Sequence, residues 1–294
     1  MRTGIIGLGA LGSSLGLALR AQKAWADVTG FDASARVQNE AKRKGAIREG
    51  TSDVADLLSD ADVVVLAIPP LAVVEFLREY GPRLRADTVV TDVATSKQTI
   101  LDAAERHVPA RSGFVGGHPL VSCLPGIEHV DLTLYQGRPW CLAAAIGTAG
   151  DRLETVSALV EAAGARPYFV DAVEHDAWVA GVEGLPRIMA AALARVSVGS
   201  GAWRELIRVS GAPFDNAVAA AAGNTQEARD VALTSGAALV SWLDRMIVEL
   251  DRWREAVAES RSDVLEQQFA DAAALWERWR EERKNQAVKG KGAP

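Results

Sequence analysis

The sequence has little cysteine, few aromatic residues and no excess of positive charge. Of 294 residues only Cys123 and Cys141 are cysteines, and Phe, Trp and Tyr together make up 6%. Two cysteines form neither a disulfide framework nor a metal-type spacing, so we expect a reducing, cytoplasmic environment. The 32 Lys and Arg against 38 Asp and Glu give a net charge of −6. This is the wrong sign for tracking a phosphate backbone, so nucleic acid is not an expected partner.

Long hydrophobic runs are also missing. The apolar stretch 63–77 is interrupted by Pro69-Pro70 and carries Glu75, so it falls short of the roughly 20 residues of a membrane span. The uncharged run 3–19 contains five glycines, which make a poor hydrophobic helix. We therefore expect neither a membrane segment nor a signal peptide.

The composition that remains is that of a globular protein, 49% hydrophobic with 26 Gly. Short β-branched runs alternate with helical patterns up to about residue 170, which predicts an α/β, Rossmann-like and mostly parallel sheet. After Asp171 the strand signals stop and the sequence becomes Ala-rich and helical. The sequence thus predicts a Rossmann-like domain over residues 1–170 and an all-α domain over residues 171–294.

The helical half contains two apolar stripes with alternating spacings of four and three. They are Leu239, Leu243, Met246, Leu250, Trp253 and Val257, followed by Leu265, Phe269, Ala272, Trp276 and Trp279. This period places one face of each helix in a seam. The seam is either the core of a bundle within one subunit or, in part, an interface between two copies, and we expect a homodimer through this domain.

A glycine motif at the N-terminus indicates a nucleotide site. Gly7-Leu8-Gly9-Ala10-Leu11-Gly12 fits G-x-G-x-x-G directly after a predicted strand and before an apolar helix. Gly7 permits the tight turn, Gly9 lets a pyrophosphate approach the backbone, and Gly12 allows close packing of helix on strand. We expect this segment to bind a dinucleotide.

Asp32 ends the second predicted strand, 20 residues after Gly12. A carboxylate there accepts hydrogen bonds from the ribose hydroxyls of NAD and repels a 2′-phosphate, so NAD is expected rather than NADP. Arg36, one helical turn on, is the residue that would favour NADP. The alternative for Asp32 is a helix N-cap, with Ser34 competing for that position.

Two further segments follow predicted strands at the edge where open α/β sheets bind ligands. The turn Ala67-Ile68-Pro69 is expected to line the cofactor. The segment Thr91-Asp92-Val93-Ala94-Thr95-Ser96-Lys97 can hold a substrate or the nicotinamide amide, with Val93 on the cofactor side. Its alternative role is helix capping by Thr95 or Ser96.

His118 is the best catalytic candidate among the four histidines. It stands in Gly116-Gly117-His118-Pro119-Leu120, which we expect to be a loop after a short strand 114–115. A neutral imidazole there can take the proton of a hydroxyl whose carbon gives a hydride to nicotinamide. The alternative is a packed structural histidine. His175, between Glu174 and Asp176, looks like a cap or hinge at the start of the helical domain.

Together these motifs resemble the prephenate/arogenate dehydrogenase family in order and spacing. The resemblance covers nearly the whole chain and implies a Rossmann-like domain, a helical dimerisation domain and NAD(P)-linked oxidative decarboxylation in tyrosine biosynthesis. It implies that His118 contacts the ring hydroxyl of prephenate or arogenate. Thr95 and Lys97 stand in the family's Ser and Lys positions and are expected to be catalytic residues, with Thr95 also binding the substrate.

The chain also departs from the family. Where the family commonly has Ser-His-Leu-Pro-His, this sequence has Glu183-Gly184-Leu185-Pro186-Arg187, and the family's downstream arginines are replaced in 213–218. A dicarboxylate still needs a cation, so we expect Arg187 to bind a substrate carboxylate. Glu183 can pair with an amino group, either of arogenate or of an amino-substituted prephenate analogue, or Arg187 can simply neutralise it.

Two alternatives to prephenate or arogenate oxidation stay open at this stage. The first is a related dehydrogenase of an amino-deoxy prephenate analogue or another small hydroxy acid. The second is a non-catalytic NAD-binding protein. No metal site is expected.

Overall fold

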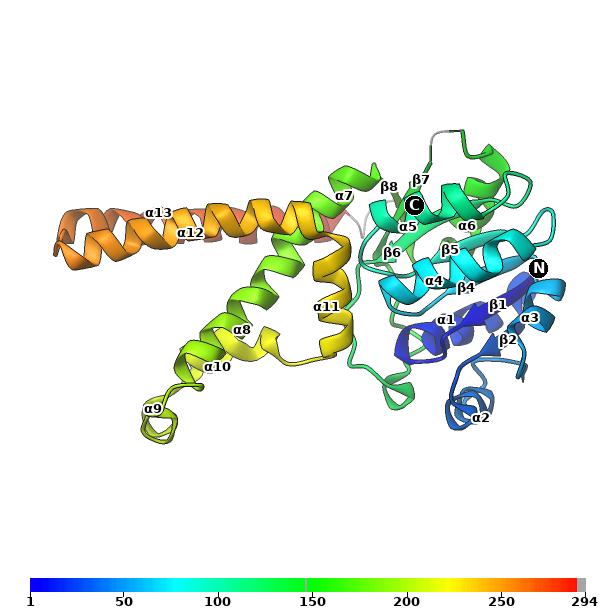
Figure 1. Cartoon of the computed structure of the whole chain (residues 1–294), viewed down its shortest axis with the longest axis horizontal. Helices are drawn as coiled ribbons and strands as arrows, with labels where there is room; N and C mark the ends of the chain where they lie inside the picture. Colours follow the sequence, from blue (N-terminus) through cyan, green and yellow to red (C-terminus); the bar gives the residue numbers. More distant parts are fainter. Residues whose placement is uncertain (146, 290–294) are drawn as a thin grey trace. The chain divides into compact units, whose positions relative to one another are not determined.

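The computed structural model describes residues 1–145 and 147–289 and divides into two compact units, 1–239 and 240–294 (Figure 1). The first unit contains the sheet, its covering helices and the first part of the helical half. The second unit is a pair of long helices. The predicted domain boundary near residue 171 falls within the first unit and stays a prediction.

The first unit is built on an eight-stranded sheet in the order β3-β2-β1-β4-β5-β6-β7-β8. All neighbouring strands are parallel except β6 and β7. The strands are β1 (Arg2–Ile6), β2 (Asp27–Phe31), β3 (Glu49–Gly50), β4 (Val63–Leu66), β5 (Val89–Asp92), β6 (Phe114–Pro119), β7 (Pro139–Ala144) and β8 (Arg166–Phe169). Strands β2 and β4 lie on opposite sides of β1, so the strand order reverses at β1. This reversal is the switch point at which such sheets bind ligands.

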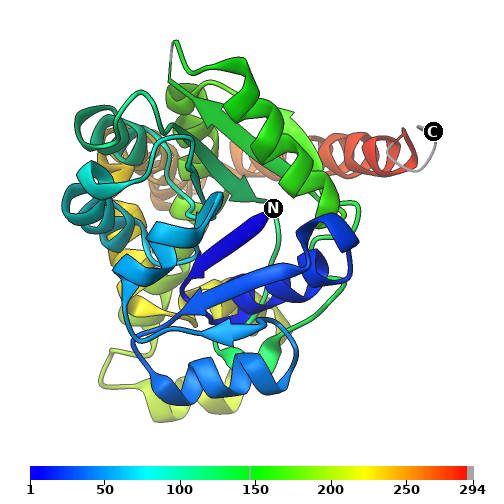
Figure 2. The ribbon, with the colours of Figure 1, turned by 90° about the vertical axis from the view of Figure 1, so that its right-hand side faces the viewer.

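Helices cover both faces of the sheet (Figure 2). Alternating side chains of the central strands pack in two hydrophobic cores, one on each face. Ile5 and Val65 pack in one core, while Ile6 and Val64 pack in the other. The covering helices are α1 (Ala10–Arg20), α2 (Ala35–Arg43), α3 (Val54–Asp60), α4 (Pro70–Tyr80), α5 (Gln98–His107) and α6 (Gly150–Ala162), with short 3₁₀ turns at 23–25, 81–83 and 127–129. The predicted α/β, Rossmann-like fold is confirmed.

The helical part of the first unit begins with a long helix. It consists of α7 (Ala172–Val179), a π-helical turn (Ala180–Gly184) and α8 (Leu185–Ser197), and is followed by α9 (Trp203–Val209), α10 (Ala212–Val218), a 3₁₀ turn at 219–221 and α11 (Thr225–Thr234). Residues 172–197 form a helix that is long and apolar enough to cross a membrane by length and composition alone. The sequence-based expectation of no membrane segment did not consider this stretch. Its first turns, however, bury His175 and Asp176, and α7 contacts α5 and β7, as expected of a helix in a folded domain.

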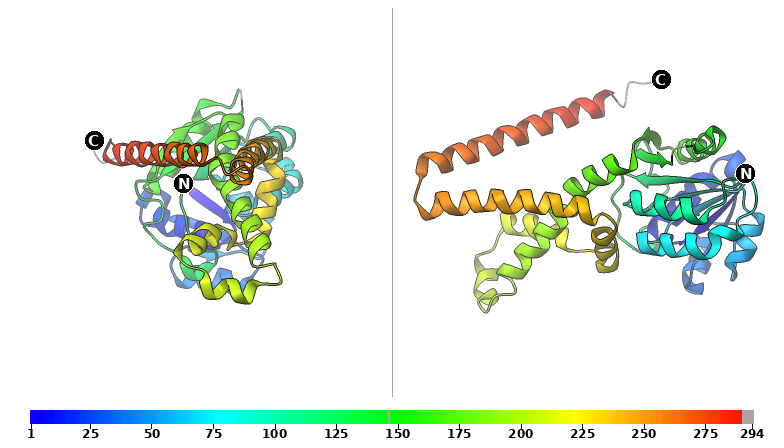
Figure 3. Two further views of the ribbon diagram at one scale, coloured as in Figure 1. Left: turned by 90° about the vertical axis from the view of Figure 1, so that its left-hand side faces the viewer. Right: turned by 45° about the horizontal axis from the view of Figure 1, so that its top comes forward.

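The second unit is a hairpin of α12 (Gly236–Ala258), which starts at the end of the first unit, and α13 (Ser262–Lys289) (Figure 3). The rings of Trp253 and Phe269 pack edge to face, with centroids 4.7 Å apart. The stripe residues Leu250, Phe269 and Trp276 nevertheless stay 49%, 66% and 52% exposed. Leu243, Met246 and Trp253 are half-buried, so the hairpin buries its apolar stripes only in part.

Candidate active site

The glycine motif forms a tight turn between β1 and α1, and its three glycines differ in what surrounds them. Gly7 has φ +92°, and a Cβ there would lie 2.3 Å from the carbonyl oxygen of Ala67. A Cβ on Gly12 would lie 2.0 Å from the Gly7 carbonyl oxygen. A Cβ on Gly9 would meet nothing within 4 Å, and no side chain caps the first turn of α1. Gly7 and Gly12 are thus required by packing, whereas Gly9 leaves room for a phosphate at the helix N-terminus.

Asp32 lies directly after β2 and is tied to this turn. One carboxylate oxygen accepts the Leu8 N–H at 2.9 Å, and the other accepts the Ser34 N–H at 2.9 Å. Ser34, not Asp32, is the N-cap of α2, so the capping alternative for Asp32 is wrong. A carboxylate has about four lone-pair positions, so Asp32 can still accept ribose hydroxyls. Arg36 is exposed in the first turn of α2.

The turn after β4 and the end of β5 complete the nucleotide end of the sheet. Ala67, Ile68 and Pro69 are half-buried, and Ala67 lies against Gly7. Val93 is buried and donates its N–H to the Leu66 carbonyl oxygen at 3.1 Å. The residues predicted for the cofactor therefore lie at the carboxyl ends of neighbouring strands, and their arrangement fits a dinucleotide.

A buried ion pair follows β5. Lys97 and Asp92 are both fully buried, and Lys97 Nζ donates to Asp92 and, at 2.7 Å, to the Gly117 carbonyl oxygen. Asp92 also accepts the N–H groups of Ala94 and Gly117, each at 2.9 Å. Burial raises the pKa of Asp92 and lowers that of Lys97, and each partner opposes the shift of the other. This fully bonded pair fixes β6 beside the end of β5.

His118 lies within β6 and not in a loop, which corrects the sequence-based expectation. Pairing with β7, where His118 is opposite Cys141, extends the strand to Pro119. Gly117 is required by this packing, because a Cβ there would lie 2.4 Å from the Asp92 carbonyl oxygen and 2.8 Å from Trp140 Nε1. His118 is only 5% exposed.

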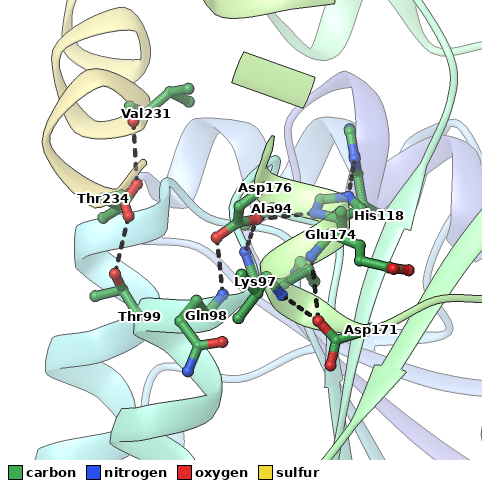
Figure 4. A network of polar contacts seen from close by, with 12 residues as sticks. Ala94, Lys97, Gln98, Thr99, His118, Asp171, Glu174, Asp176, Val231 and Thr234 are labelled. Atoms are coloured by element: carbon green, nitrogen blue, oxygen red, sulfur yellow. Dashed lines mark hydrogen bonds and ion pairs between the residues drawn. The ribbon is translucent and has the colours of Figure 1, made fainter. Parts of the chain in front are cut away.

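His118 is held by two residues of α7 that sequence reasoning did not assign to the site. Its Nδ1 lies 2.9 Å from Nε2 of His175, and Nδ1 of His175 lies 2.8 Å from Asp176 Oδ1. Asp176 also accepts the N–H groups of Lys97 and Gln98, at 2.8 and 2.9 Å (Figure 4). His175 is therefore neither cap nor hinge: it is 1% exposed, and Asp171 caps α7.

This chain of bonds assigns the imidazole tautomers. The Asp176 carboxylate can only accept, so His175 donates from Nδ1 and presents an unprotonated Nε2. His118 then donates from Nδ1, which leaves its Nε2 as a free lone pair. Burial, with help from the neighbouring His175 and Lys97, lowers the pKa of His118 well below its usual range. His118 is thus a neutral base with a defined accepting nitrogen.

The loop hydroxyls do not cap α5. Its first N–H groups, from Lys97 and Gln98, are bound by Asp176, so the capping alternative for Thr95 and Ser96 is wrong. Thr95 is half-buried. Ser96 is fully buried, and its hydroxyl has no hydrogen-bond partner within the described part of the chain.

Glu183 and Arg187 are at the π-helical turn and at the start of α8. Neither makes a hydrogen bond or ion pair among residues 1–145 and 147–289, so Arg187 does not pair directly with Glu183. Glu183 is exposed and Arg187 is half-buried. Nearby protein raises the pKa of the Glu183 carboxyl, and the positive charge of Arg187 opposes this shift.

A glycine loop on a parallel sheet, with a buried neutral histidine three strands away, defines a Rossmann-type oxidoreductase. The sequence matches the family models described as prephenate dehydrogenase nucleotide-binding domain, over residues 15–169, and dimerization domain, over residues 171–271. The chain belongs to the prephenate dehydrogenase family.

Known relatives are similar along most of the chain. A cyclohexadienyl dehydrogenase of Zymomonas mobilis is 27% identical, covering 91% of this chain and 92% of that protein. A prephenate dehydrogenase of Bacillus subtilis is 25% identical, covering 91% and 73%. The crystal structure of prephenate dehydrogenase from Aquifex aeolicus, in complex with hydroxyphenyl propionate and NAD+, has the same fold, with a TM-score of 0.86 at 24% identity over 94% of this chain and 97% of that one.

Proposed function

We propose that the protein catalyses the NAD-dependent oxidative decarboxylation of prephenate or arogenate. The observation that carries this proposal is the chain of hydrogen bonds from Asp176 through His175 to His118, on the same sheet as a dinucleotide turn, in a chain of the prephenate dehydrogenase family. A neutral buried base next to a hydride acceptor is what oxidation of a hydroxyl group needs.

In this reaction His118 Nε2 accepts the proton of the C4 hydroxyl as the C4 hydrogen leaves as hydride. Bound NAD supplies the hydride acceptor. The bond between C1 and its carboxylate then breaks, its electron pair aromatises the ring, and carbon dioxide leaves. The phenolate oxygen takes back the proton from His118. Asp176 and His175 act as positioning residues that keep Nε2 of His118 unprotonated, and Thr95 supplies a hydroxyl to the substrate.

NAD is the proposed cofactor, with NADP disfavoured by the carboxylate of Asp32. That side chain is held by the Leu8 and Ser34 N–H groups and so cannot turn away from a 2′-phosphate without losing both bonds. Gly7 to Gly12, Ala67 to Pro69 and Val93 would hold the nucleotide.

Arg187 is the proposed partner of a substrate carboxylate. It is half-buried and has no ion-pair partner in the described part of the chain. Arg187→Ala should raise KM for the substrate by about 10- to 100-fold, the value of a lost charge-assisted hydrogen bond. Arg195→Ala, an exposed arginine of the same helix, is the matched control. An unchanged KM in Arg187→Ala would contradict this role.

We also propose a cytoplasmic homodimer. The exposed apolar stripes of α12 and α13 and the match to a dimerization domain support the pairing, and the free thiols of Cys123 and Cys141 support a reducing compartment. Sedimentation of the purified protein at several concentrations tests the dimer. A monomer at micromolar concentration would contradict it.

The activity is tested by following nicotinamide absorbance with purified protein, using prephenate and arogenate in turn with NAD and NADP. We expect turnover of at least one substrate, with NAD the better cofactor. Binding of NAD without turnover of either substrate would contradict the proposed reaction.

A further inference from the structure

Lys97 is bonded at its side chain and at its backbone, and the two sets of bonds lead to the same histidine. Its ammonium donates to the Gly117 carbonyl oxygen at 2.7 Å, and its backbone N–H donates to Asp176 Oδ1 at 2.8 Å. The same oxygen of Asp176 lies 2.8 Å from Nδ1 of His175, whose Nε2 lies 2.9 Å from Nδ1 of His118. Since a peptide bond joins Gly117 to His118, these contacts close a ring.

The two glycines before His118 leave room for this arrangement. A Cβ on Gly116 would lie 3.1 Å from Cδ of Lys97, so the aliphatic part of the lysine passes close to that residue. A Cβ on Gly117 would lie 2.4 Å from the Asp92 carbonyl oxygen. The Gly-Gly pair therefore lets β6 approach the end of β5 closely enough for the ammonium to reach a backbone carbonyl.

The ion pair replaces strand pairing next to His118. The ladder between β5 and β6 ends at the pair Thr91 and Val115. Two residues further along β6, the Gly117 N–H donates to the Asp92 carboxylate at 2.9 Å, and the Gly117 carbonyl oxygen accepts from Lys97. The two charged side chains thus bind both backbone polar groups of the residue that precedes His118.

The ammonium of Lys97 contacts protein groups and is closed off from solvent. Lys97 and Asp92 are both fully buried. If the ammonium moved away to bind a substrate, the Asp92 carboxylate would stay buried without its cation, which is strongly unfavourable. His118, in contrast, has a free lone pair on Nε2 in the tautomer that its partners impose.

We infer that Lys97 is a positioning residue that holds His118 through the Gly117 carbonyl and does not contact the substrate. This role replaces the catalytic one that the family resemblance implies for Lys97. The relay from Asp176 holds the imidazole of His118, while Lys97 holds the backbone, so Nε2 has a fixed position as well as a fixed tautomer. A displacement of a reacting group by about 1 Å can cost about 10²-fold in rate. The inference rests on the proposed function and deepens it.

The test measures kcat and KM at saturating NAD, with whichever of prephenate and arogenate the wild type oxidises. Lys97→Met should lower kcat by about 10- to 100-fold and leave KM for the substrate within about threefold, because Nε2 is displaced while the binding contacts remain. In the His118→Asn background the same change should lower the residual kcat by less than about threefold, because the base is already absent. Lys42→Met, at an exposed position in α2, is the matched control.

The other kinetic outcomes would overturn the inference. A KM raised by about tenfold or more in Lys97→Met would show a contact with the substrate. Equal losses of kcat with and without His118 would show that Lys97 acts independently of that base, and an unchanged kcat in Lys97→Met would exclude a positioning role. Turnover of neither substrate by the wild type would overturn the proposed function instead.

A second measurement needs no variant to fold. Reductive methylation of the native wild type with formaldehyde and cyanoborohydride labels accessible lysine amines, and mass spectrometry identifies the labelled residues. We expect methylation of Lys42, which is exposed, and none of Lys97, whose ammonium is buried in an ion pair. Methylation of Lys97 would place its amine in an open site and overturn the inference, whether or not the protein oxidises either substrate.

Discussion

The two ends of the ligand-binding edge are built in different ways. At the nucleotide end, residues close in sequence form an open turn, and Gly9 faces empty space. At the histidine end, side chains from β5, β6 and α7 meet in a buried hydrogen-bonded network, in which Asp176 accepts the backbone N–H of Lys97, 79 residues away. The first end is made to receive a ligand, whereas the second is made to hold one imidazole in one tautomer.

This difference predicts which substitutions should change ligand binding and which should change catalysis or stability. A change at Gly9 should alter nucleotide binding with little effect on folding, because no protein atom lies within 4 Å of a Cβ placed there. Changes at the histidine end should alter catalysis or stability strongly, because the groups there are buried and hydrogen-bonded to one another.

Replacing His118 should have the largest effect. In His118→Asn the proton acceptor is lost, and kcat should fall by roughly 10² to 10⁴, with NAD affinity unchanged. Steady-state kinetics and titration of NAD by fluorescence measure the two quantities. The exposed histidine in His129→Asn serves as control. A kcat within threefold or so of the wild type would remove His118 from the chemistry.

Breaking the buried ion pair of Lys97 and Asp92 should have the next largest effect. Lys97→Met leaves the Asp92 carboxylate buried without its cation, so the free energy of unfolding should fall by about 3–5 kcal/mol. Denaturant unfolding measures this loss. The double variant with Asp92→Asn should recover part of it, and equal losses in single and double variants would show that the two charges are not coupled.

Filling the space above Gly9 tests the other end. Gly9→Ala places a methyl group where a pyrophosphate would approach, so NAD affinity should weaken by roughly tenfold. Stability should change by less than about 0.5 kcal/mol, because the added Cβ meets no protein atom within 4 Å. Unchanged NAD affinity would contradict this placement of the cofactor.

The smallest expected effect is on acid stability. Below about pH 6.5 the unfolded chain protonates His118, whereas the folded protein does not until its lowered pKa is reached. The unfolded state then binds more protons, so the free energy of unfolding should decrease as pH falls, by at most ~1.4 kcal/mol per pH unit. His118→Asn should lack this contribution, and identical pH dependence in both proteins would contradict a buried neutral imidazole.

Sequence reasoning succeeded where function depends on local spacing. The glycine motif, Asp32 and the alternation of strands and helices are all local patterns, and the fold they predict is confirmed. Strand β3 was missed because Glu49–Gly50 is too short to give a pattern. The strand containing His118 was predicted too short, because its pairing with β7 is a long-range contact.

The histidine relay could not be predicted, because its partners are distant in sequence. His175 looked like a helix start, which in fact is capped by Asp171. Thr95 and Ser96 have the right chemistry for a cap, but Asp176 takes that role from another element. The only local signal was a histidine followed directly by an aspartate, and that pair gains meaning only once β6 lies beside it.

The central claim is that His118 is a neutral base whose Nε2 is free. Nitrogen-15 NMR of the imidazole rings at pH 7, with His118 assigned by comparison with His118→Asn, tests it directly. We predict a protonated Nδ1 and an unprotonated Nε2 on His118. A doubly protonated ring, or the opposite tautomer, would contradict the relay from Asp176 through His175.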